Sequence, residues 1–433
     1  MTTSAFCWLV LAPRELGNPY TGIVTFVVLP LLFFAGLILI PAGVWLAKRR
    51  IGHDLAAMPD RRGAIKRLAI FFAATTLVNL VFATQVTYHA VEHMEGVGFC
   101  GQSCHVMQPQ FRAYQAATHN QVACVECHVA PGASGWLQAK AAGTRQLIET
   151  VSNSYPRPIP SGTESEKLIE SSKTCEGCHS RARIAATRVR VRASYAQDEG
   201  NTVTYTVLTA RVGGVGAGGI HGAHLDPEID IRYRATGANR QTIPYVVWRN
   251  RRTNEVHEYR SDAGVSASQA GEATPMQCTD CHNRPAHSFE RAGRAVDDAL
   301  ASGAISRSLP YVKKNALALL TGVYPSQAAA DQAIRSDFRT RYPSREDAEA
   351  AAAAVSAIYA RNVFPDLKVT WDTYPDNRGH TDFPGCFRCH DGQHVTKSGR
   401  AIGQDCSSCH DLLAVEEANP EVLDKLNPTW RKQ

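Results

Sequence analysis

The sequence predicts a mainly α-helical and irregular chain with two N-terminal transmembrane helices and a small antiparallel β insert. Three observations predict this fold class. Two long stretches near the N-terminus lack charge, a central region alternates β-branched and polar residues, and cysteines occur in pairs along most of the 433 residues. A chain of this length usually forms more than one domain. Groups bound at the cysteine pairs would replace part of the side-chain core and leave much irregular structure.

Six cysteine pairs each carry a histidine directly after the second cysteine, and only Cys7 is left unpaired. Five have the spacing Cys-x-x-Cys-His, whereas the first has one additional residue. This is the attachment signature of a c-type haem, in which two thiols bind the porphyrin and the histidine binds the iron. The motifs are Cys100/Cys104/His105, Cys124/Cys127/His128, Cys175/Cys178/His179, Cys278/Cys281/His282, Cys386/Cys389/His390 and Cys406/Cys409/His410.

Paired cysteines also occur in structural zinc sites and in disulfide frameworks. Neither alternative explains the histidines, which are 16 of the 433 residues. One would therefore fall at a given position by chance only about 4% of the time, yet all six pairs have one. We predict six covalent haems. For the first motif, a cysteine pair without haem remains the alternative.

Two stretches are long enough to cross a bilayer. Residues 22–47 carry no charge, and residues 68–91 lack Asp, Glu, Lys and Arg. An uncharged run of about 18 or more residues is typical of a spanning helix, although 68–91 could also be a buried core helix. Residues 48–67 hold seven Lys or Arg against two Asp, and the positive-inside rule places this loop in the cytoplasm. We expect a bacterial inner-membrane protein whose haem-bearing part lies in the periplasm.

The formal net charge of +6 is largely local, since residues 48–67 supply +5 of it. Nucleic-acid binding is therefore not predicted.

The motifs and the sequence periodicity divide the chain into four parts. Residues 1–93 form the membrane anchor, and residues 94–182 hold the first three haem motifs. Residues 183–277 are a β-rich insert, and residues 278–433 form a helical scaffold with the last three motifs. The polar tail from about residue 414 is expected to be loose.

Ten histidines lie outside the motifs. His53 falls in the cytoplasmic loop and His257 alternates within a predicted strand, which leaves eight candidates for six sixth-ligand positions. Two imidazoles close an iron to substrates and suit it to electron transfer, although any single histidine could instead lie on the surface or form hydrogen bonds. The candidates are His89, His93, His119, His221, His224, His287, His380 and His394.

Position favours some of these candidates. His89 and His93 share one helix face at the outer membrane boundary, where the first motif begins. His221 and His224 follow a glycine-rich turn and are interpreted as reaching a haem from a flexible loop. Met107, two residues after His105, would raise the first haem's potential as a ligand, or it is a core methionine. The ligands we favour are His119, His221, His287, His380 and His394, with His93 beside the first motif.

Several segments resemble the NapC/NirT type of membrane-anchored multihaem cytochromes c, which act as quinol dehydrogenases. The resemblance rests on FCGQSCHVMQPQFRAY, ATHNQVACVECHVAPGASGW followed by Lys140, YPRPIP, CTDCHNRPAH and GCFRCHDGQH. It implies that Met107 lies at the first haem and that Lys140 helps to line a quinol pocket beside it. From the residues alone, Lys140 could equally be a solvated charge. The wider family usually has one anchor helix and four haems, so this chain resembles a larger branch with two helices and six haems.

The expected activity is quinol oxidation at the outer membrane face. Menaquinol or ubiquinol would dock beside the first motif, give up two electrons one at a time, and release its protons to the periplasm. The electrons would pass along the haems to a periplasmic or outer-membrane redox partner or an extracellular acceptor. Neither uncharged stretch supports a transmembrane proton path. Two alternatives remain: a reductase of a small oxidant such as nitrite, which needs an open iron, and an electron-transfer subunit of a larger membrane complex without its own quinol site.

Overall fold

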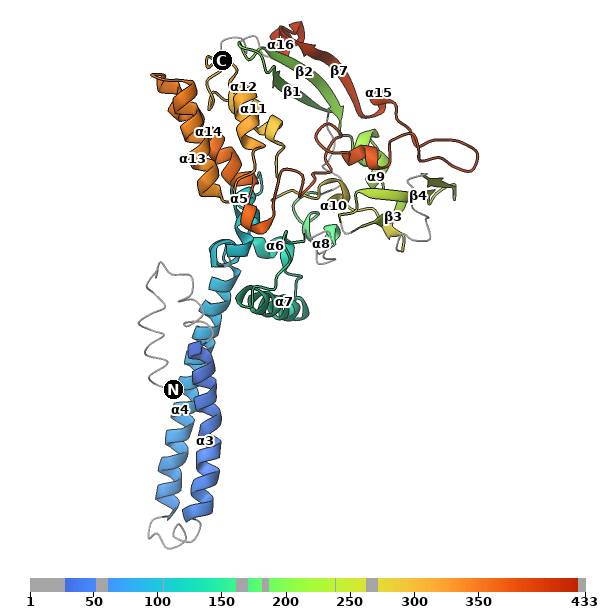
Figure 1. Ribbon diagram of the computed structural model, residues 1–433. Coiled ribbons are helices and arrows are strands. Elements are labelled where there is room, and N and C mark those ends of the chain that lie inside the picture. The colour runs from blue at the N-terminus through green and yellow to red at the C-terminus, as the bar shows by residue number, and fades with distance from the viewer. Residues whose placement is uncertain are drawn as a thin grey trace. The chain divides into compact units, whose positions relative to one another are not determined.

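The computed structural model describes residues 28–51, 61–103, 105–160, 170–180, 187–237, 239–261 and 272–426 (Figure 1). The chain divides into two units. The first comprises residues 1–108 and 123–125, and the second comprises residues 109–122 and 126–433.

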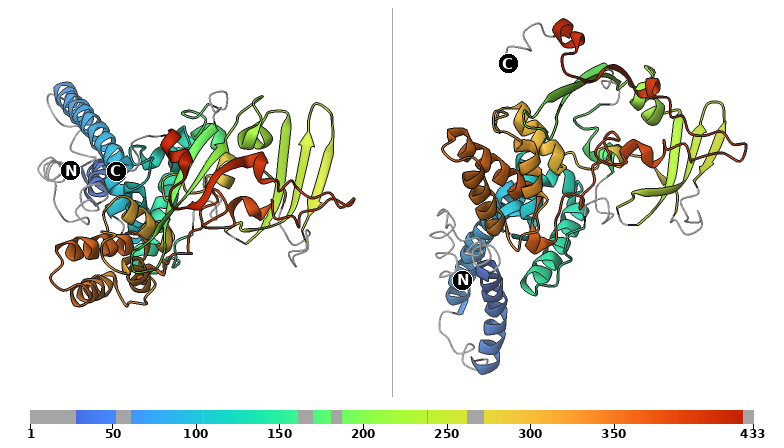
Figure 2. Two further views of the ribbon diagram at one scale, coloured as in Figure 1. Left: turned by 90° about the horizontal axis from the view of Figure 1, so that it is seen from above. Right: turned by 45° about the horizontal axis from the view of Figure 1, so that its top comes forward.

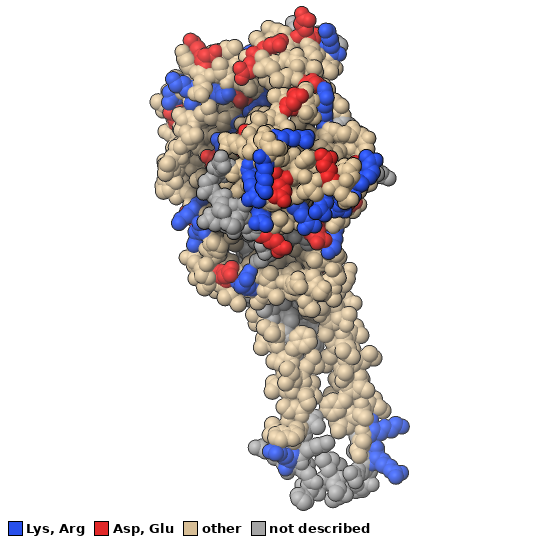
Figure 3. All heavy atoms as spheres, turned by 90° about the vertical axis from the view of Figure 1, so that its right-hand side faces the viewer, with Lys and Arg blue, Asp and Glu red and all other residues tan. Residues whose placement is uncertain are grey.

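The first unit is built mainly from two helices, α3 (Leu29–Ile51) and α4 (Arg61–Glu95). Among the described residues, one helical segment is long and apolar enough to cross a membrane, namely Ile65–Glu95 in α4. At 1.5 Å per residue its 31 residues exceed a hydrocarbon core of about 30 Å. Figure 3 shows Lys and Arg gathered at one end of this helix pair and little charge along the rest. The span predicted over 68–91 therefore lies inside a helix with the required length and composition.

The first predicted span, over 22–47, is not confirmed. Its first six residues lie outside the described ranges, and the apolar part of α3, Phe34–Gly43, is shorter than a bilayer crossing requires. This span stays a prediction. Cys7 and residues 52–60 of the basic loop also lie outside the described ranges.

The first haem motif follows α4 within the same unit. After Glu95 the chain forms a π-helical turn, η3 (Phe99–Ser103), and a 3-10 turn, η4 (His105–Met107). Cys100 N donates a hydrogen bond to Gly96 O over 3.2 Å, which continues the helical path from α4 into the motif.

The second unit contains a helical core. Its helices are α11 (Ala292–Ala301), α12 (Val312–Leu320), α13 (Gln327–Arg341) and α14 (Glu346–Asn362). α14 buries Ala348, Ala351, Ala352 and Val355 on one face, the three- and four-residue spacing of an amphipathic helix. This face packs in one cluster with the buried Phe338 and Leu320. The other helices described after η4 are α5 (Gln108–Gln115) and α6 (Cys124–His128), which both begin in the first unit, and α7 (Ala133–Val151), α8 (Ser171–Thr174), α9 (Gly219–Leu225), α10 (Cys278–Cys281), α15 (Cys406–Cys409) and α16 (Glu421–Leu426), with short turns η6 (Pro365–Leu367) and η7 (Gly385–Arg388).

The second unit also contains two antiparallel sheets, ordered β1–β2–β7 and β5–β4–β3–β6 (Figure 2). The small antiparallel β element predicted from the alternating residues is thus confirmed, but as two sheets instead of one. The strands are β1 (Thr187–Tyr195), β2 (Val203–Arg211), β3 (Ile229–Thr236), β4 (Thr242–Asn250), β5 (Val256–Arg260), β6 (Thr274–Pro275) and β7 (His410–Glu417).

The expectation of a loose tail from about residue 414 is wrong for the described part of that tail. β7 continues to Glu417 and pairs with β2, and α16 follows it. The physical reason is a small buried cluster in which Val207 of β2, Ala414 of β7 and Leu423 of α16 pack together.

Candidate functional site: paired histidines at the cysteine motifs

In the five motifs after the first, the cysteine pair lies on a single helical turn. α6, α10, α15 and η7 contain four of these turns, and a turn after α8 contains the fifth. His282 N donates to Cys278 O over 2.8 Å, and His390 N donates to Cys386 O over 3.0 Å. Residues three apart lie on one side of a helical turn. Both sulfurs could therefore attach to one porphyrin, and the histidine that follows could bind its iron.

Each of these five motif histidines lies opposite one other histidine. A metal–imidazole bond of about 2 Å, plus about 1 Å from nitrogen to ring centre, places two axial imidazoles about 6 Å apart between centroids. The observed separations fit this value. They are 6.2 Å for His128 and His287, 6.0 Å for His179 and His119, 6.2 Å for His282 and His221, 5.9 Å for His390 and His224, and 6.1 Å for His410 and His380.

Backbone carbonyls orient several of these rings. The Nδ1 atoms of His287, His119 and His224 lie 2.9, 3.1 and 2.7 Å from the carbonyl oxygens of Gln110, Pro285 and Ile220. His390 Nδ1 lies 2.6 Å from Gly403 O. A carbonyl accepts a hydrogen bond, so Nδ1 carries the proton and Nε2 keeps the lone pair that an iron needs.

Two further rings contain a buried nitrogen without a hydrogen-bond partner among the described residues. These atoms are His221 Nδ1 and His410 Nδ1. A buried polar atom left without a partner costs about 1–3 kcal/mol. Both rings belong to the histidine pairs, so a haem with its iron and polar substituents fits this position.

Burial keeps five of the paired imidazoles in the neutral form that binds metals. It lowers the pKa of His128, His221, His224 and His282 below the ordinary histidine value. For His287, burial lowers the pKa to about 4, opposed by its hydrogen bond to Gln110 O. Since a ligating imidazole must be unprotonated, these sites are prepared for iron at neutral pH.

Zinc does not match this arrangement. Within the ranges that the structure describes, no group of three or more His, Cys, Asp or Glu side chains is placed to hold a metal ion. A zinc centre needs about four such ligands around one point. The histidine pairs instead leave room between two rings for a planar group.

The structure corrects the expectation that His394 is an iron ligand. Its side chain is buried, with Nδ1 2.8 Å from Asp391 Oδ1 and Nε2 2.6 Å from Ile243 O. Both nitrogens are engaged by protein oxygens, so neither remains for iron. His224, a candidate that was not favoured, lies opposite a motif histidine instead.

The glycine-rich turn before His221 is also more ordered than expected, because it leads into α9. Gly213 has a φ of 61°, and a Cβ there would lie 1.8 Å from Gly218 O. Only glycine permits this close approach. The turn starts α9, whose two histidines lie opposite His282 and His390. A helical signal over residues 219–225 could have indicated that both histidines are held in fixed positions, each facing a different cysteine motif.

Three expected residues near the membrane stay predictions. The ring of His93 lies against that of Phe99, with 5.5 Å between the two ring centroids. Met107 ends η4, but Cys104 and the His105 side chain lie outside the described part. Lys140 is on α7, with Nζ 5.3 Å from the ring centre of Trp136.

One short segment serves three histidine pairs. His282 belongs to the fourth motif, and His287, five residues later, lies opposite His128 of the second. Between them, Pro285 O accepts the hydrogen bond that orients His119, opposite His179 of the third motif. The second, third and fourth motifs are therefore held together by residues 282–287.

Neighbouring motifs form a series. Burial raises the pKa of Cys127, and the charges of Cys175 and Cys178 raise it further, so the second and third motifs are close. His179 is likewise close enough to lower the pKa of His282, after burial and the charge of His221. The third motif is therefore close to the fourth.

The last three motifs continue the series. Burial raises the pKa of Cys389 to about 12, with smaller effects from Arg388 and Cys281. Burial also raises the pKa of Cys409, and Cys386 adds to it. The fifth motif is thus close to the fourth, and the sixth is close to the fifth.

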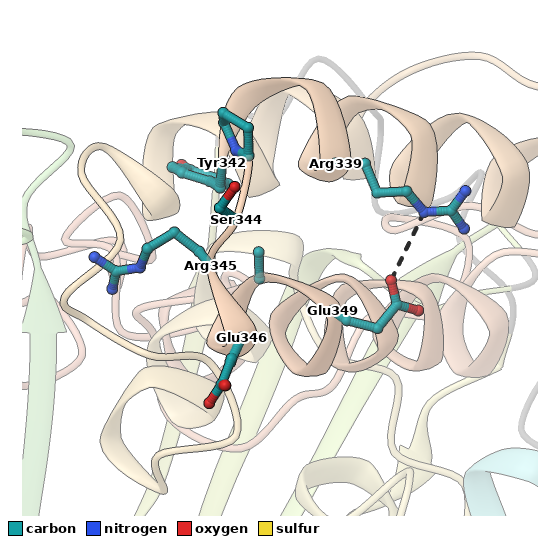
Figure 4. Close-up of a pocket in the computed structure, with 8 residues that line it drawn as sticks. Arg339, Tyr342, Ser344, Arg345, Glu346 and Glu349 are labelled. Carbon is teal, nitrogen blue, oxygen red and sulfur yellow. Dashed lines mark ion pairs between the residues drawn. The ribbon is translucent and has the colours of Figure 1, made fainter.

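The cavity shown in Figure 4 lies elsewhere. It has a volume of about 550 Å³ and is lined at the α13–α14 turn by residues that include Tyr342, Arg345 and Glu346. Arg339 pairs with Glu349 across it. Its lining contains no motif residue and no paired histidine, so the candidate site is the series of histidine pairs.

These features define a membrane-type multihaem c-type cytochrome. Residues 62–207 match the N-terminal region of the NapC/NirT cytochrome c family. The cytochrome c-type protein ImcH of Geobacter sulfurreducens is 35% identical over 425 residues, which cover 93% of this chain and 83% of that protein. No solved structure matches the chain. The chain belongs to the NapC/NirT family of cytochromes c, and the expected resemblance is confirmed.

Proposed function

We propose that this chain is a hexahaem quinol dehydrogenase of the bacterial inner membrane, with its haem-bearing part in the periplasm. It would oxidise menaquinol or ubiquinol and pass the electrons to a periplasmic or extracellular acceptor. The observation that carries the proposal is the series of five histidine pairs with separations of 5.9 to 6.2 Å. Pairs of imidazoles leave an iron no open position, which suits electron transfer.

The residues divide into three roles. The cysteines of the six motifs attach the haems, and the motif histidines with His119, His221, His224, His287 and His380 bind the irons. Bound haem supplies reversible one-electron exchange at iron. Carbonyls such as Gln110 O and Pro285 O hold the distal rings in place, which keeps the coordination the same in both oxidation states.

Electron entry is proposed at the first motif. Cys100 follows α4, the helix with the candidate membrane span, by five residues. This is the depth at which a lipid-soluble quinol would reach the protein. By family resemblance, Lys140 would hydrogen-bond a quinol oxygen and stabilise its negative charge as the proton leaves.

The experiment that tests the function is quinol oxidation by the purified full-length chain in detergent. A menaquinol analogue is added without oxygen, and reduction is followed by the haem absorbance. We expect the quinol to reduce the protein. Reduction by dithionite but by neither menaquinol nor ubiquinol analogues would overturn the proposal and favour a subunit without its own quinol site.

A reductase of a small oxidant is the other enzymatic alternative. It requires an iron with an open position, and the five ring pairs leave none at the second to sixth motifs. Addition of nitrite to the reduced protein should therefore produce no catalytic turnover. Sustained nitrite-dependent oxidation would contradict this expectation.

A further inference from the structure

The sixth motif lies at the edge of an unusual sheet face. In the β1–β2–β7 sheet, Arg188 pairs with Ala210, and Ala210 pairs with His410. Directly paired residues of antiparallel strands point to the same face. With strands about 4.8 Å apart, the Arg188 backbone is about 10 Å from that of His410, and both residues lie on the face where a haem held by His410 would bind.

A second row continues this face. Arg190 pairs with Leu208, and Leu208 with Leu412, whose side chain is 52% exposed. The opposite face differs, because Leu423 of α16 packs there on Val207 and Ala414. The His410 face thus carries exposed Arg188, Arg190 and Leu412, whereas the opposite face exposes Val189 and Val191 and is partly covered by α16.

The charges on this sheet are unevenly distributed. Arg192 is neutralised by Asp382, beside His380, and Arg211 by Asp411. Arg188 and Arg190 are exposed and have no ion-pair partner among the residues that the structure describes. The opposite end of β7 carries the exposed Glu416 and Glu417. The sheet is therefore basic near the sixth motif and acidic away from it.

We propose that this face, defined by Arg188, Arg190, Leu412 and His410, is the docking surface for an electron-accepting protein with carboxylates around its redox group. The proposal rests on the electron-transfer function above. His410 places the sixth motif on this face, so the sixth motif is the point from which an electron would leave toward a partner docked here. Unpaired arginines attract carboxylates and accelerate encounter, exposed Leu412 supplies apolar contact, and the acidic far end fixes the partner's orientation. One electron leaves the ferrous haem held by His380 and His410 and reduces the acceptor by one electron.

The test bypasses quinol, so its outcome is independent of the quinol proposal. The full chain is reduced with dithionite, freed of excess reductant, and mixed rapidly with an oxidised acidic acceptor, plastocyanin, or with the cation hexaammineruthenium(III). The double variant R188E/R190E should oxidise about ten-fold more slowly with plastocyanin at low ionic strength. The difference should shrink in about 0.5 M salt because the charges are screened. With the cation, the same variant should react faster.

The matched control is R251E/R252E, which makes the same charge change in the turn between β4 and β5. Arg251 and Arg252 are exposed and pair with Asp230 and Glu228. We expect less than about two-fold change in this control. Equal loss of rate in both variants would show a net-charge effect and overturn the docking site, as would unchanged rates in R188E/R190E.

A second measurement is the midpoint potential of the haems in R188E/R190E. Unchanged potentials support docking. A shift in potential large enough to account for the slower rate would mean that the arginines interact with the haem carboxylates, and it would overturn the docking site.

Discussion

Arg388 Nη2 donates a hydrogen bond to Asp280 O over 2.6 Å and so joins the fifth cysteine motif to the fourth. The same guanidinium donates to Gly385 O over 2.9 Å and to Arg240 O over 3.1 Å. All three acceptors are backbone oxygens. The separation between two neighbouring motifs is thus fixed by one side chain that lies inside the fifth motif.

Arg388→Ala should reduce both stability and electron flow past the fourth motif. Three carbonyls lose a charged donor, for which we expect a cost of about 1–3 kcal/mol. Thermal unfolding followed by circular dichroism measures this change. Arg400→Ala, at an exposed position, is the control, and equal effects of the two substitutions would show that the Arg388 contacts contribute nothing specific.

The histidine pairs predict which substitutions change the spin state of iron. His224→Ala should convert one haem from low-spin to high-spin while covalent attachment is retained, because His390 then lies opposite no imidazole. His394→Ala should leave every haem low-spin and destabilise the fold by about 1–3 kcal/mol, since it removes a buried partner of Asp391. Electron paramagnetic resonance separates the two. A high-spin signal in His394→Ala would reinstate His394 as a ligand.

Lys140→Ala should slow reduction by quinol about ten- to a hundred-fold and leave reduction by dithionite intact. The loss corresponds to about 1–3 kcal/mol for one charged hydrogen bond. Stopped-flow absorbance measures both rates. Arg145→Ala, on the same helix and paired with Glu149, should keep the normal rate. Normal quinol rates in Lys140→Ala would mean that the lysine is a solvated charge.

The two-helix anchor predicts opposite sides for two fusion sites. A reporter placed in the loop at residues 50–62 should be cytoplasmic, and one placed after residue 430 should be periplasmic. Paired phosphatase and fluorescent-protein fusions make this measurement. Both reporters on one side would leave α4 as the single span.

Much of the site could be predicted because it is local. A haem motif is contained in five or six residues, so the sequence shows its cysteines and proximal histidine directly. His119, His221, His287 and His380 were favoured and each lies opposite a motif histidine. Which motif each would face could not be predicted, because it depends on contacts between distant segments.

The predictions that were wrong also depend on contacts between distant segments. Choosing His224 over His394 requires knowing that Ile243 O lies against His394, 151 positions away. The order of β7 likewise depends on β2, about 200 residues earlier. The first anchor helix is a different case, since its apolar composition is evident but α3 places only a short apolar part among the described residues.

The segment from His282 to His287 has a consequence for how this chain can diverge. Its six residues include the motif histidine that faces His221, the histidine that faces His128 of the second motif, and the carbonyl that orients His119, which faces the third motif. An inserted or deleted residue would displace these two histidines and the carbonyl relative to their partners at all three sites at once. We therefore expect its length to be invariant among relatives that keep these haems.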